Sequence, residues 1–351
     1  MKRYGYLFEK VCEVDNIKLA IMNASKGKRD RANVKNIVEH KDHYANLLRT
    51  LLISDMYNPS PYSKFVIYDF SSKKEREIYA PKFYPDQVLH WATMQVIQPY
   101  LEQSMYHLSV GSRRGKGAHY AKRYLEKWLR NDKKHTKYCL KLDIRKFYPS
   151  VPQDKLKKLL ARKFKDERLL NLLYAIIENT DEGIPIGNYT SQWFANFYLT
   201  PLDNYIKTVL HVKYYIRYMD DMILLSGNKR ELRKARVAIK KFLTDYGLEL
   251  KGNWQVFKVD DRSIDFMGFR FWHYKTTVRK RTSLRIKRRF KKANKNLNFH
   301  NASACFSYMG WLKYVDMHDY YTKYIKPYFD IKKAKEVIRN ENRKHSKTTT
   351  L

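Results

Sequence analysis

The chain is poor in cysteine and has no long apolar run, and each of these features excludes a class of protein. Only three of its 351 residues are cysteines, namely Cys12, Cys139 and Cys305, an odd number placed far apart. They offer neither a disulfide framework nor the paired spacing of a zinc site. No apolar stretch approaches the roughly 18 residues that span a bilayer, and no signal-peptide pattern follows Met1. We therefore expect a cytoplasmic protein.

Acidic residues are also scarce, because 35 Asp and Glu stand against 71 Lys and Arg, a formal net charge of +36. Such an excess implies a polyanionic partner, either nucleic acid or an anionic membrane surface. The 29 tyrosines offer flat faces on which unpaired bases can stack, and nothing in the sequence spans a membrane. Nucleic acid is therefore favoured as the partner. The length allows two or three subdomains around a sizeable core.

Two of the few acids are adjacent, within Tyr214–Ser226 (YYIRYMDDMILLS). Asp220 and Asp221 fall between two runs rich in aromatic and branched residues, which are typical of strands, at the point where a hairpin would turn. Like charges this close raise each other's pKa unless a cation lies between them. Magnesium is the natural cation because it prefers oxygen ligands and leaves room for phosphate oxygens. A hairpin that merely turns on Asp-Asp is the plain alternative.

A third carboxylate, Asp143, ends a second predicted strand, Tyr138–Ile144 (YCLKLDI). Its apolar residues share one parity, whereas Lys141 and Asp143 share the other, so Asp143 projects from a strand whose opposite face is buried. The strand pattern breaks at Pro149, where a strand should end. One carboxylate from a strand and two from an adjacent hairpin form the ligand set of two-metal phosphoryl transfer. Taken alone, Asp143 could equally be a strand-edge acid.

The segments before Asp143 mix helices with one hairpin. We expect polar helices within residues 1–56, above all at Val34–Leu52. Strands are expected at Phe65–Asp69 and Arg76–Tyr79, joined by a polar turn at Ser71–Glu75, and a helix at Gln87–Gln98 closed by Pro99. The loop Gly111–Gly117 (GSRRGKG) opens another helix at Ala118. Basic residues on glycine-flexed backbone at a helix start suit phosphate binding, although a flexible surface loop is the simpler alternative.

The segments after Asp143 are mainly helical. One or two amphipathic helices are expected over Asp154–Glu178, and a long helix bent at Pro201 over Thr190–Val209. The polar tail Asn340–Leu351 is expected to be disordered.

Taken in order, these segments resemble a reverse transcriptase from about residue 65 to 315. The matching motifs are Lys74–Pro81 (KEREIYAP) and Ser112–His119 (SRRGKGAH) for the fingers, Asp143–Ser150 (DIRKFYPS) and the YMDD string for the palm, Phe266-Met267-Gly268 for the primer grip, and Met309-Gly310-Trp311 within a short thumb. Six motifs in one order are far more specific than any one of them.

The resemblance implies an α+β, right-hand polymerase fold, with a palm of antiparallel sheet plus helices. The implied parts are an N-terminal helical extension (1–60), fingers (61–137), palm (138–272, with 154–185 partly fingers-associated), a helical thumb (273–330) and a disordered basic tail (331–351). No room is expected for an RNase H, endonuclease or maturase domain.

The resemblance also implies residue roles. Asp143 would bind two Mg²⁺ ions, for which Mn²⁺ can substitute, with help from the Ile144 carbonyl and Asp220, while Asp221 would hold the loop or complete the coordination. The remaining implied roles are triphosphate binding by Lys74 and Arg76, template or triphosphate binding by Arg113, exclusion of the sugar 2′-hydroxyl by Tyr148, protonation of pyrophosphate by Lys251, and primer contact by Phe266, Met267 and Gly268.

The segment Ile186–Gln192 (IGNYTSQ) separates this chain from most bacterial reverse transcriptases, which carry a Gln-Gly pair followed by Ser-Pro there. Ile186, Gly187 and Gln192 would lie beside the nucleotide. Isoleucine at the first position resembles the enzymes of diversity-generating retroelements, which copy a template RNA with errors at adenines. An apolar side chain cannot fix the nucleotide by a directional hydrogen bond. The alternative is that Ile186 is only a packed loop residue.

The function implied is RNA-directed DNA polymerisation, with dNTPs, a template RNA, the RNA/cDNA hybrid and an accessory variability protein oligomer as partners. Two alternatives stay open. One is an antiviral-defence enzyme of retron-like or abortive-infection type, although Asn301–Cys305 does not complete the usual retron element. The other is a palm domain retained as a non-catalytic RNA-binding scaffold.

Overall fold

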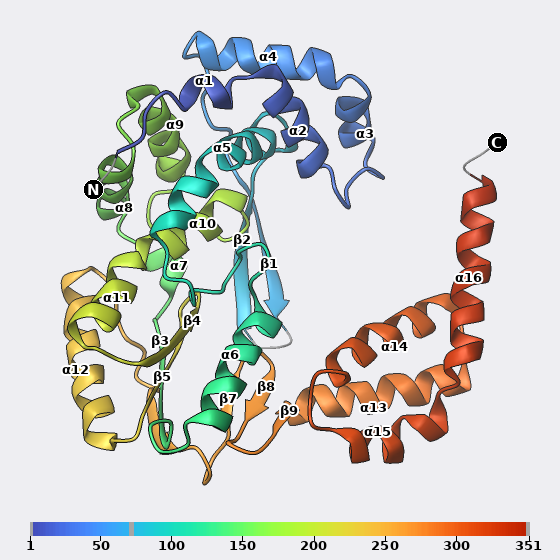
Figure 1. The fold of residues 1–351 in the computed structure, drawn as a ribbon. Helices are drawn as coiled ribbons and strands as arrows, with labels where there is room; N and C mark the ends of the chain where they lie inside the picture. Colours follow the sequence, from blue (N-terminus) through green and yellow to red (C-terminus); the bar gives the residue numbers. More distant parts are fainter. Residues whose placement is uncertain (1–2, 70–73, 349–351) are drawn as a thin grey trace. The chain divides into compact units, whose positions relative to one another are not determined.

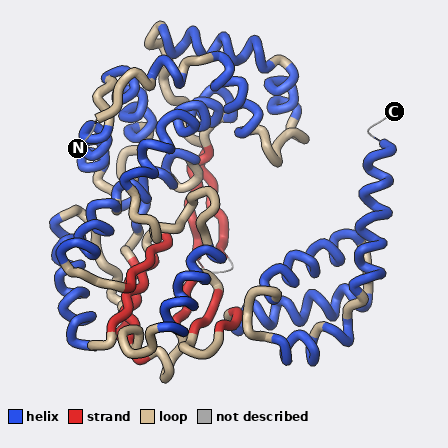
Figure 2. Tube along the Cα trace, in the orientation of Figure 1, coloured by secondary structure: helices blue, strands red, loops and turns tan. Residues whose placement is uncertain are grey.

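The structure is a computed structural model that describes residues 3–69 and 74–348 (Figure 1). Its backbone forms two compact units, each assembled from separate segments. The first unit contains residues 1–114, 141–223 and 233–254, and the second contains residues 115–140, 224–232 and 255–351. Both combine helices with short strands (Figure 2). The units do not follow the predicted linear boundaries, since residues 115–137, expected in the fingers, group with the expected thumb.

The N-terminal region of the first unit is helical, as predicted, but differs in detail. It contains α1 (Phe8–Val11), α2 (Val14–Ala24), α3 (Ala32–Glu39) and α4 (Lys41–Ile53). The helical stretch expected over Val34–Leu52 is divided into two helices, because the backbone breaks at His40 (φ −104°, ψ 34°). The break gives each helix its own buried face: Val34 and Ile37 in α3, and Ala45, Leu48 and Leu52 in α4.

Helix α5 (Val88–Ser104) runs through Pro99, where the sequence predicted its end. A proline inside a helix removes one hydrogen bond and costs about 3 kcal/mol. Ile97 and Leu101 flank Pro99 and are both fully buried. We attribute the continued helix to this burial, because each large aliphatic side chain taken out of water returns about 1.5–3 kcal/mol.

The predicted hairpin is confirmed as β1 (Ser63–Asp69) and β2 (Lys74–Ala80), which pair antiparallel with Ser63 opposite Ala80. The turn predicted around Ser71–Glu75 lies mostly outside the described residues. The short π-helix η1 (Phe83–Gln87) joins this hairpin to α5. Four consecutive β1 residues are more than two-fifths exposed, so the ribbon is solvated on both faces: Phe65, Val66, Ile67 and Tyr68.

A four-stranded sheet carries the predicted acids, in the order β4–β5–β3–β6. Its strands are β3 (Tyr138–Asp143), β4 (Tyr214–Tyr218), β5 (Asp221–Ser226) and β6 (Gln255–Lys258). The sequence predicted the first three, and β3 and β5 each contribute residues to both units. Leu140 and Leu142 are fully buried, whereas Lys141 and Asp143 are half-buried, which is the expected alternation.

The helices around this sheet follow the apolar pattern, with one difference. The stretch expected to form one or two helices is α8 (Gln153–Lys163) and α9 (Glu167–Glu178), after the short α7 (Phe147–Ser150). The long helix expected over Thr190–Val209 is instead three pieces, α10 (Tyr189–Tyr198), α11 (Thr200–Asn204) and the π-helix η2 (Tyr205–Val209). Pro201 lies in the first turn of α11, where its missing N–H leaves no helical hydrogen bond unmade. Helix α12 (Lys229–Asp245) follows β5.

The second unit contains α6, a three-stranded sheet and the C-terminal helices. Its elements are α6 (Ala118–Asn131), β7 (Ile264–Phe266), β8 (Phe269–Phe271), β9 (Thr276–Val278), α13 (Lys280–Lys295), α14 (Phe299–Leu312), α15 (His318–Tyr324), the 3₁₀ turn η3 (Lys326–Tyr328) and α16 (Ile331–Thr348). The disordered tail expected over 331–351 is wrong as far as Thr348, because this stretch is helical. Helix α16 packs on α14 and buries Ala334.

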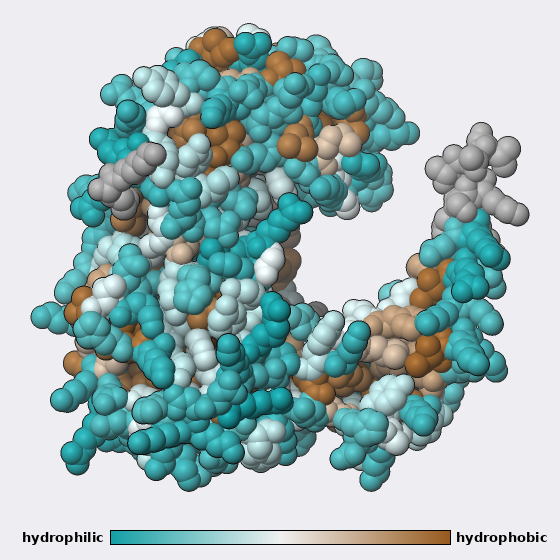
Figure 3. Space-filling model, viewed as in Figure 1, coloured by the Kyte–Doolittle hydropathy of each residue, from teal (hydrophilic) through white to brown (hydrophobic). Residues whose placement is uncertain are grey.

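The surface is mostly polar on the face drawn in Figure 3, in keeping with the charge of the chain. None of the described helices is both long and apolar enough to cross a membrane.

Candidate active site

A cleft of about 1190 Å³ opens in the first unit, where the predicted palm and fingers residues meet. Five stretches line it: β2, the chain after β3, the loop before α10, the β4–β5 turn and the chain after α12. Its lining includes Arg76, Asp143, Ile144, Tyr148, Ile186, Asp220 and Lys251. Seven of the predicted site residues therefore share one cleft.

Asp143 and Asp220 meet in this cleft. Asp143 is the last residue of β3, and Asp220 lies in the tight turn between β4 and β5, where Met219 adopts a left-handed φ of 53°. Burial, followed by the charge of the Asp143 carboxylate and a hydrogen bond with it, raises the pKa of Asp220 to about 7. The two carboxylates are thus close enough to share a proton. The predicted convergence of Asp143 with the YMDD turn is confirmed.

Two lysines lie against these acids. Lys251 Nζ is 2.8 Å from Asp143 Oδ2, and the Lys251 N–H donates to the Asp143 carbonyl at 2.9 Å. Lys141 Nζ is 3.3 Å from Asp221 Oδ2. The sequence placed Lys251 in the site but assigned no role to Lys141. The signal was present in the strand pattern, since Lys141 and Asp143 share one parity of β3.

The donor set fits a metal site that substrate completes. Within the described parts of the chain, no three His, Cys, Asp or Glu side chains gather closely enough to hold a metal. Asp143 and Asp220 nevertheless offer adjoining hard oxygen ligands, and the buried Ile144 lines the same cleft. Magnesium is typically held by one or two carboxylates together with phosphate oxygens and waters. Asp221 instead faces Lys141, which favours the loop-holding role predicted for it.

Tyr148 and Arg76 approach the acids from the other walls of the cleft. Tyr148 is half-buried, and burial followed by the nearby Asp220 charge raises the pKa of its hydroxyl, while Arg76 lowers it. Arg76 projects from β2 and is exposed. Both residues therefore line the same cleft as the two acids. Lys74 begins β2, but its side chain is outside the described part of the structure.

The Ile186–Gly187 segment is docked on the edge of the hairpin. The Tyr79 N–H donates to the Ile186 carbonyl at 2.8 Å. Gly187 has a φ of +128°, and a Cβ there would lie 2.5 Å from the Tyr79 carbonyl oxygen, so the close approach requires glycine. The half-buried Ile186 side chain lines the cleft.

Two predicted nucleotide ligands lie elsewhere. The Arg113 side chain is only 3% exposed, and its guanidinium donates to Glu102 and to the carbonyls of Tyr106 and Ser109, each at 2.9 Å. These bonds hold the loop before α6, which argues against the predicted contact with template or triphosphate. Gln192 is exposed on α10 and does not line the cleft.

The predicted primer grip forms the β7–β8 turn of the second unit. Phe266 is fully buried, and Met267 and Gly268 both adopt positive φ, 51° and 88°. A Cβ on Gly268 would lie 3.1 Å from the ring of Trp311 in α14. The primer-grip and thumb motifs recognised in the sequence therefore touch each other.

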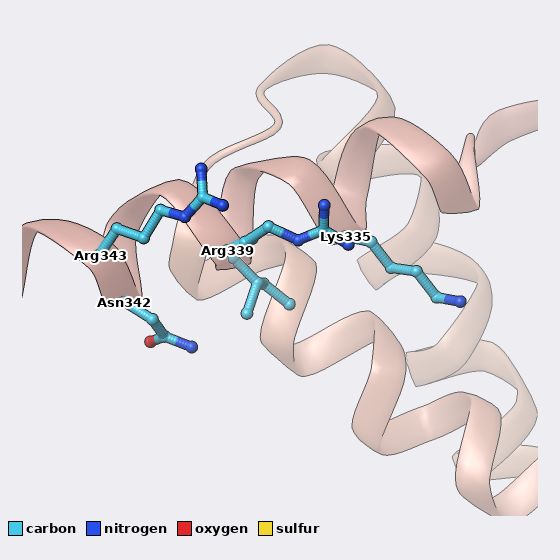
Figure 4. A pocket seen from close by; sticks show the side chains of 5 residues that line it. Lys335, Arg339, Asn342 and Arg343 are labelled. Carbon is cyan, nitrogen blue, oxygen red and sulfur yellow. The ribbon is translucent and has the colours of Figure 1, made fainter.

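A further hollow of about 480 Å³ runs along α16 (Figure 4). All of its lining residues come from this one helix: Lys335, Ile338, Arg339, Asn342 and Arg343. No acid or second element contributes to it, so it shows no catalytic chemistry.

Comparison with known proteins agrees with this geometry. Residues 73–271, more than half of the chain, match the family model described as reverse transcriptase (RNA-dependent DNA polymerase). The chain belongs to the reverse transcriptase family. The match covers β2, the palm strands and the β7–β8 turn, and so includes every predicted site residue.

Individual relatives of this reverse transcriptase are distant. Retron Ec73 reverse transcriptase of Escherichia coli is 26% identical over 211 residues, covering 55% of this chain and 66% of the relative. Protein YkfC of Escherichia coli strain K12 is 25% identical over 228 residues, covering 59% and 58%. The chain thus spans less than two thirds of the length of these curated relatives.

Solved structures confirm the fold. Apo telomerase from Candida tropicalis gives a TM-score of 0.52 at 15% identity, covering 75% of this chain and 57% of that one. Telomerase from Candida albicans with a fragment of telomeric RNA gives 0.50 at 14% identity, covering 77% and 57%. The α+β, right-hand polymerase architecture expected from the sequence is therefore confirmed.

The raised pKa of Asp220 makes the stability of the metal-free protein depend on pH. The folded state holds a proton up to about pH 7, whereas an unfolded aspartate loses it near pH 3.8. The folded state therefore binds more protons between these values, so its stability falls as pH rises. We expect wild type to lose roughly 2 kcal/mol more than Asp220→Asn between pH 5 and pH 8, by urea unfolding in EDTA. Equal losses in the two proteins would contradict the assignment.

Proposed function

We propose that this chain is an RNA-directed DNA polymerase that copies a template RNA into cDNA by two-metal phosphoryl transfer. The observation that carries the proposal is the meeting of Asp143 and Asp220 in a cleft also lined by Arg76 and Tyr148. The net charge of +36 suits binding of an RNA template and of the RNA/cDNA hybrid. A cytoplasmic location and an accessory protein partner remain predictions from the sequence.

Each residue of the cleft has a role in this reaction. Asp143 and Asp220, with the Ile144 carbonyl, would hold Mg²⁺ or Mn²⁺. When bound, such ions lower the pKa of the primer 3′-hydroxyl and neutralise charge on the phosphates. Arg76 would contact the β- and γ-phosphates of the incoming dNTP. Lys251 Nζ lies 2.8 Å from Asp143 Oδ2, and we propose Lys251 as the acid for the leaving pyrophosphate.

Loss of either metal-binding carboxylate should abolish synthesis without abolishing RNA binding. We expect Asp143→Asn and Asp220→Asn each to slow primer extension on an RNA template by at least about 10³-fold, equivalent to ~4 kcal/mol in the barrier. RNA affinity should change little, because many basic side chains outside the cleft supply it.

The matched control is Asp30→Asn, which removes an exposed loop carboxylate and should leave extension unchanged. Extension by either cleft variant at more than a tenth of the wild-type rate would refute the assignment. RNA binding by a wild type that never extends a primer would favour the non-catalytic scaffold.

Tyr148 is proposed to exclude ribonucleotides by the bulk of its ring. Tyr148→Ala should raise the use of rNTPs relative to dNTPs by about 10- to 100-fold, since a pocket clash is worth 1–3 kcal/mol. Tyr148→Phe keeps the ring and should discriminate as wild type does. Competition between labelled rNTP and dNTP in single-nucleotide extension measures the ratio, and equal ratios in all three proteins would exclude the role.

We propose further that the enzyme is of the diversity-generating type, with mutagenic retrohoming as its biological outcome. Ile186 supports this, because it lines the cleft with an apolar side chain on a loop fixed to Tyr79. Such a side chain makes no hydrogen bond that a mispaired nucleotide would leave unmet.

Ile186→Gln should therefore lower misincorporation opposite template adenine by about fivefold, the factor that one hydrogen bond supplies. Ile186→Leu keeps an apolar contact and should retain the wild-type error rate. Sequencing of cDNA copied from a defined RNA gives both rates. An unchanged rate in Ile186→Gln would mean that this residue is only a packed part of the loop.

A defence reverse transcriptase is the second candidate, favoured by the similarity to the Escherichia coli retron enzyme. The error spectrum separates the two, because errors concentrated at adenines are expected only of the diversity-generating type. A near-repeat beside the gene that differs only at adenines would support the same conclusion.

A further inference from the structure

A fully buried ion pair lies directly behind the catalytic turn, within the first unit. Arg217, in β4, and Asp203, in α11, both have side chains with no exposed surface. The Arg217 guanidinium binds Asp203 through two atoms, with Nε 2.7 Å from Oδ1 and Nη2 2.6 Å from Oδ2. Tyr215 also donates to Asp203 Oδ1 at 2.7 Å. This bidentate contact fixes the plane of the guanidinium.

The third nitrogen of Arg217 reaches the turn that carries Asp220. Nη1 donates to the Met219 carbonyl at 2.9 Å. Met219 has a left-handed φ of 53°, a conformation that costs a residue with a side chain about 1–2 kcal/mol. A strained residue of this kind persists only where its surroundings determine it. Here the donor is a buried charge three residues before the catalytic acid.

A second segment holds the same turn from the side of residues 108–111. The Asn196 side chain accepts from Arg217 Nη1 at 3.1 Å and donates to the Gly111 carbonyl at 2.6 Å. A Cβ on Gly111 would lie 2.6 Å from Met219 Sδ, so this backbone passes directly against the turn. Arg217 and the backbone at Gly111 thus lie against Met219, and Asn196 links the two.

Stability alone does not explain a buried ion pair. Taking two charges out of water offsets most of their attraction, and apolar residues of similar volume are often as stable. An apolar pair has no N–H to offer the Met219 carbonyl, however. The ion pair therefore provides one contact that an apolar pair would lack, namely the hydrogen bond from Arg217 to the Met219 carbonyl, next to Asp220.

We propose that Arg217, oriented by Asp203 and Asn196, is a positioning residue that fixes the Met219–Asp220 turn in the conformation in which Asp220 meets Asp143. The inference rests on the proposed function, because it concerns the same pair of carboxylates. We expect the hydrogen bonds around Arg217 to affect the affinity for the cation and not the binding of the nucleotide.

The test removes both charges together, in Arg217→Met/Asp203→Asn, so that no unpaired charge stays buried. The asparagine keeps an acceptor for Tyr215. We expect a folded protein whose Mg²⁺ concentration for half-maximal primer extension rises about tenfold, a loss typical of one buried hydrogen bond to a charged donor. The KM for dNTP, measured at saturating Mg²⁺, should stay within about twofold of wild type, a split that general damage to the core would not produce.

The matched control is Lys122→Met/Glu126→Gln, which removes a largely buried ion pair of 2.7 Å within α6. Its Mg²⁺ requirement should equal that of wild type. A folded Arg217→Met/Asp203→Asn protein with a wild-type Mg²⁺ requirement overturns the proposal, as does an equal rise in the control.

A milder variant decides the matter if the double variant does not fold. Asn196→Ala leaves the Arg217–Asp203 pair intact and removes the side-chain hydrogen bonds that Asn196 makes with Arg217, Ser109 and Gly111, so the Mg²⁺ requirement should rise by about threefold. Mn²⁺ affinity of the nucleic-acid-free protein, measured by electron paramagnetic resonance, should fall by the same factor. An unchanged affinity overturns the proposal. This binding measurement stands even if wild type extends no primer, a result that would refute the proposed function alone.

Discussion

The structure depends on an unfavourable contact, the approach of the Asp143 and Asp220 carboxylates in a half-buried cleft. Burial and mutual repulsion raise the pKa of Asp220 to about 7, so the two groups meet at neutral pH only if a proton or a cation lies between them. The surrounding chain supports this contact. Apolar strands fix the backbone on both sides, and Lys251 and Lys141 supply positive charge at the edges. A divalent ion that replaces the proton attracts both carboxylates, and this attraction offsets their mutual repulsion.

Much of the palm could be predicted from the sequence because its strands obey a local rule. Alternation in β3 set Asp143 and Lys141 on one face, and the apolar runs flanking Asp220 and Asp221 marked a hairpin. The same local rules failed where tertiary contacts decide. Burial of Ile97 and Leu101 carries α5 through Pro99, which no local signal indicates.

For the site, the sequence indicated which residue types are present but not which partners their side chains contact. The motifs located Arg76, Tyr148 and Ile186 in the cleft, but the order of motifs does not say which basic residue is buried. Arg113 carries the expected charge, yet its donors are directed to Glu102 and to backbone carbonyls. The link between Arg217 and Met219 was equally invisible, because its partners Asp203 and Asn196 come from helices whose packing only the fold reveals.

The central claim is that Asp143 and Asp220 share one cation in place of a proton, and calorimetry tests it directly. Mg²⁺ is titrated into the metal-free protein at pH 6.5 in buffers of different ionisation enthalpy, which gives the number of protons released. With the pKa of Asp220 at about 7, wild type should release about three quarters of a proton per site. Asp220→Asn should release none. Binding of Mg²⁺ by wild type without proton release, or equal release by both proteins, would contradict the account.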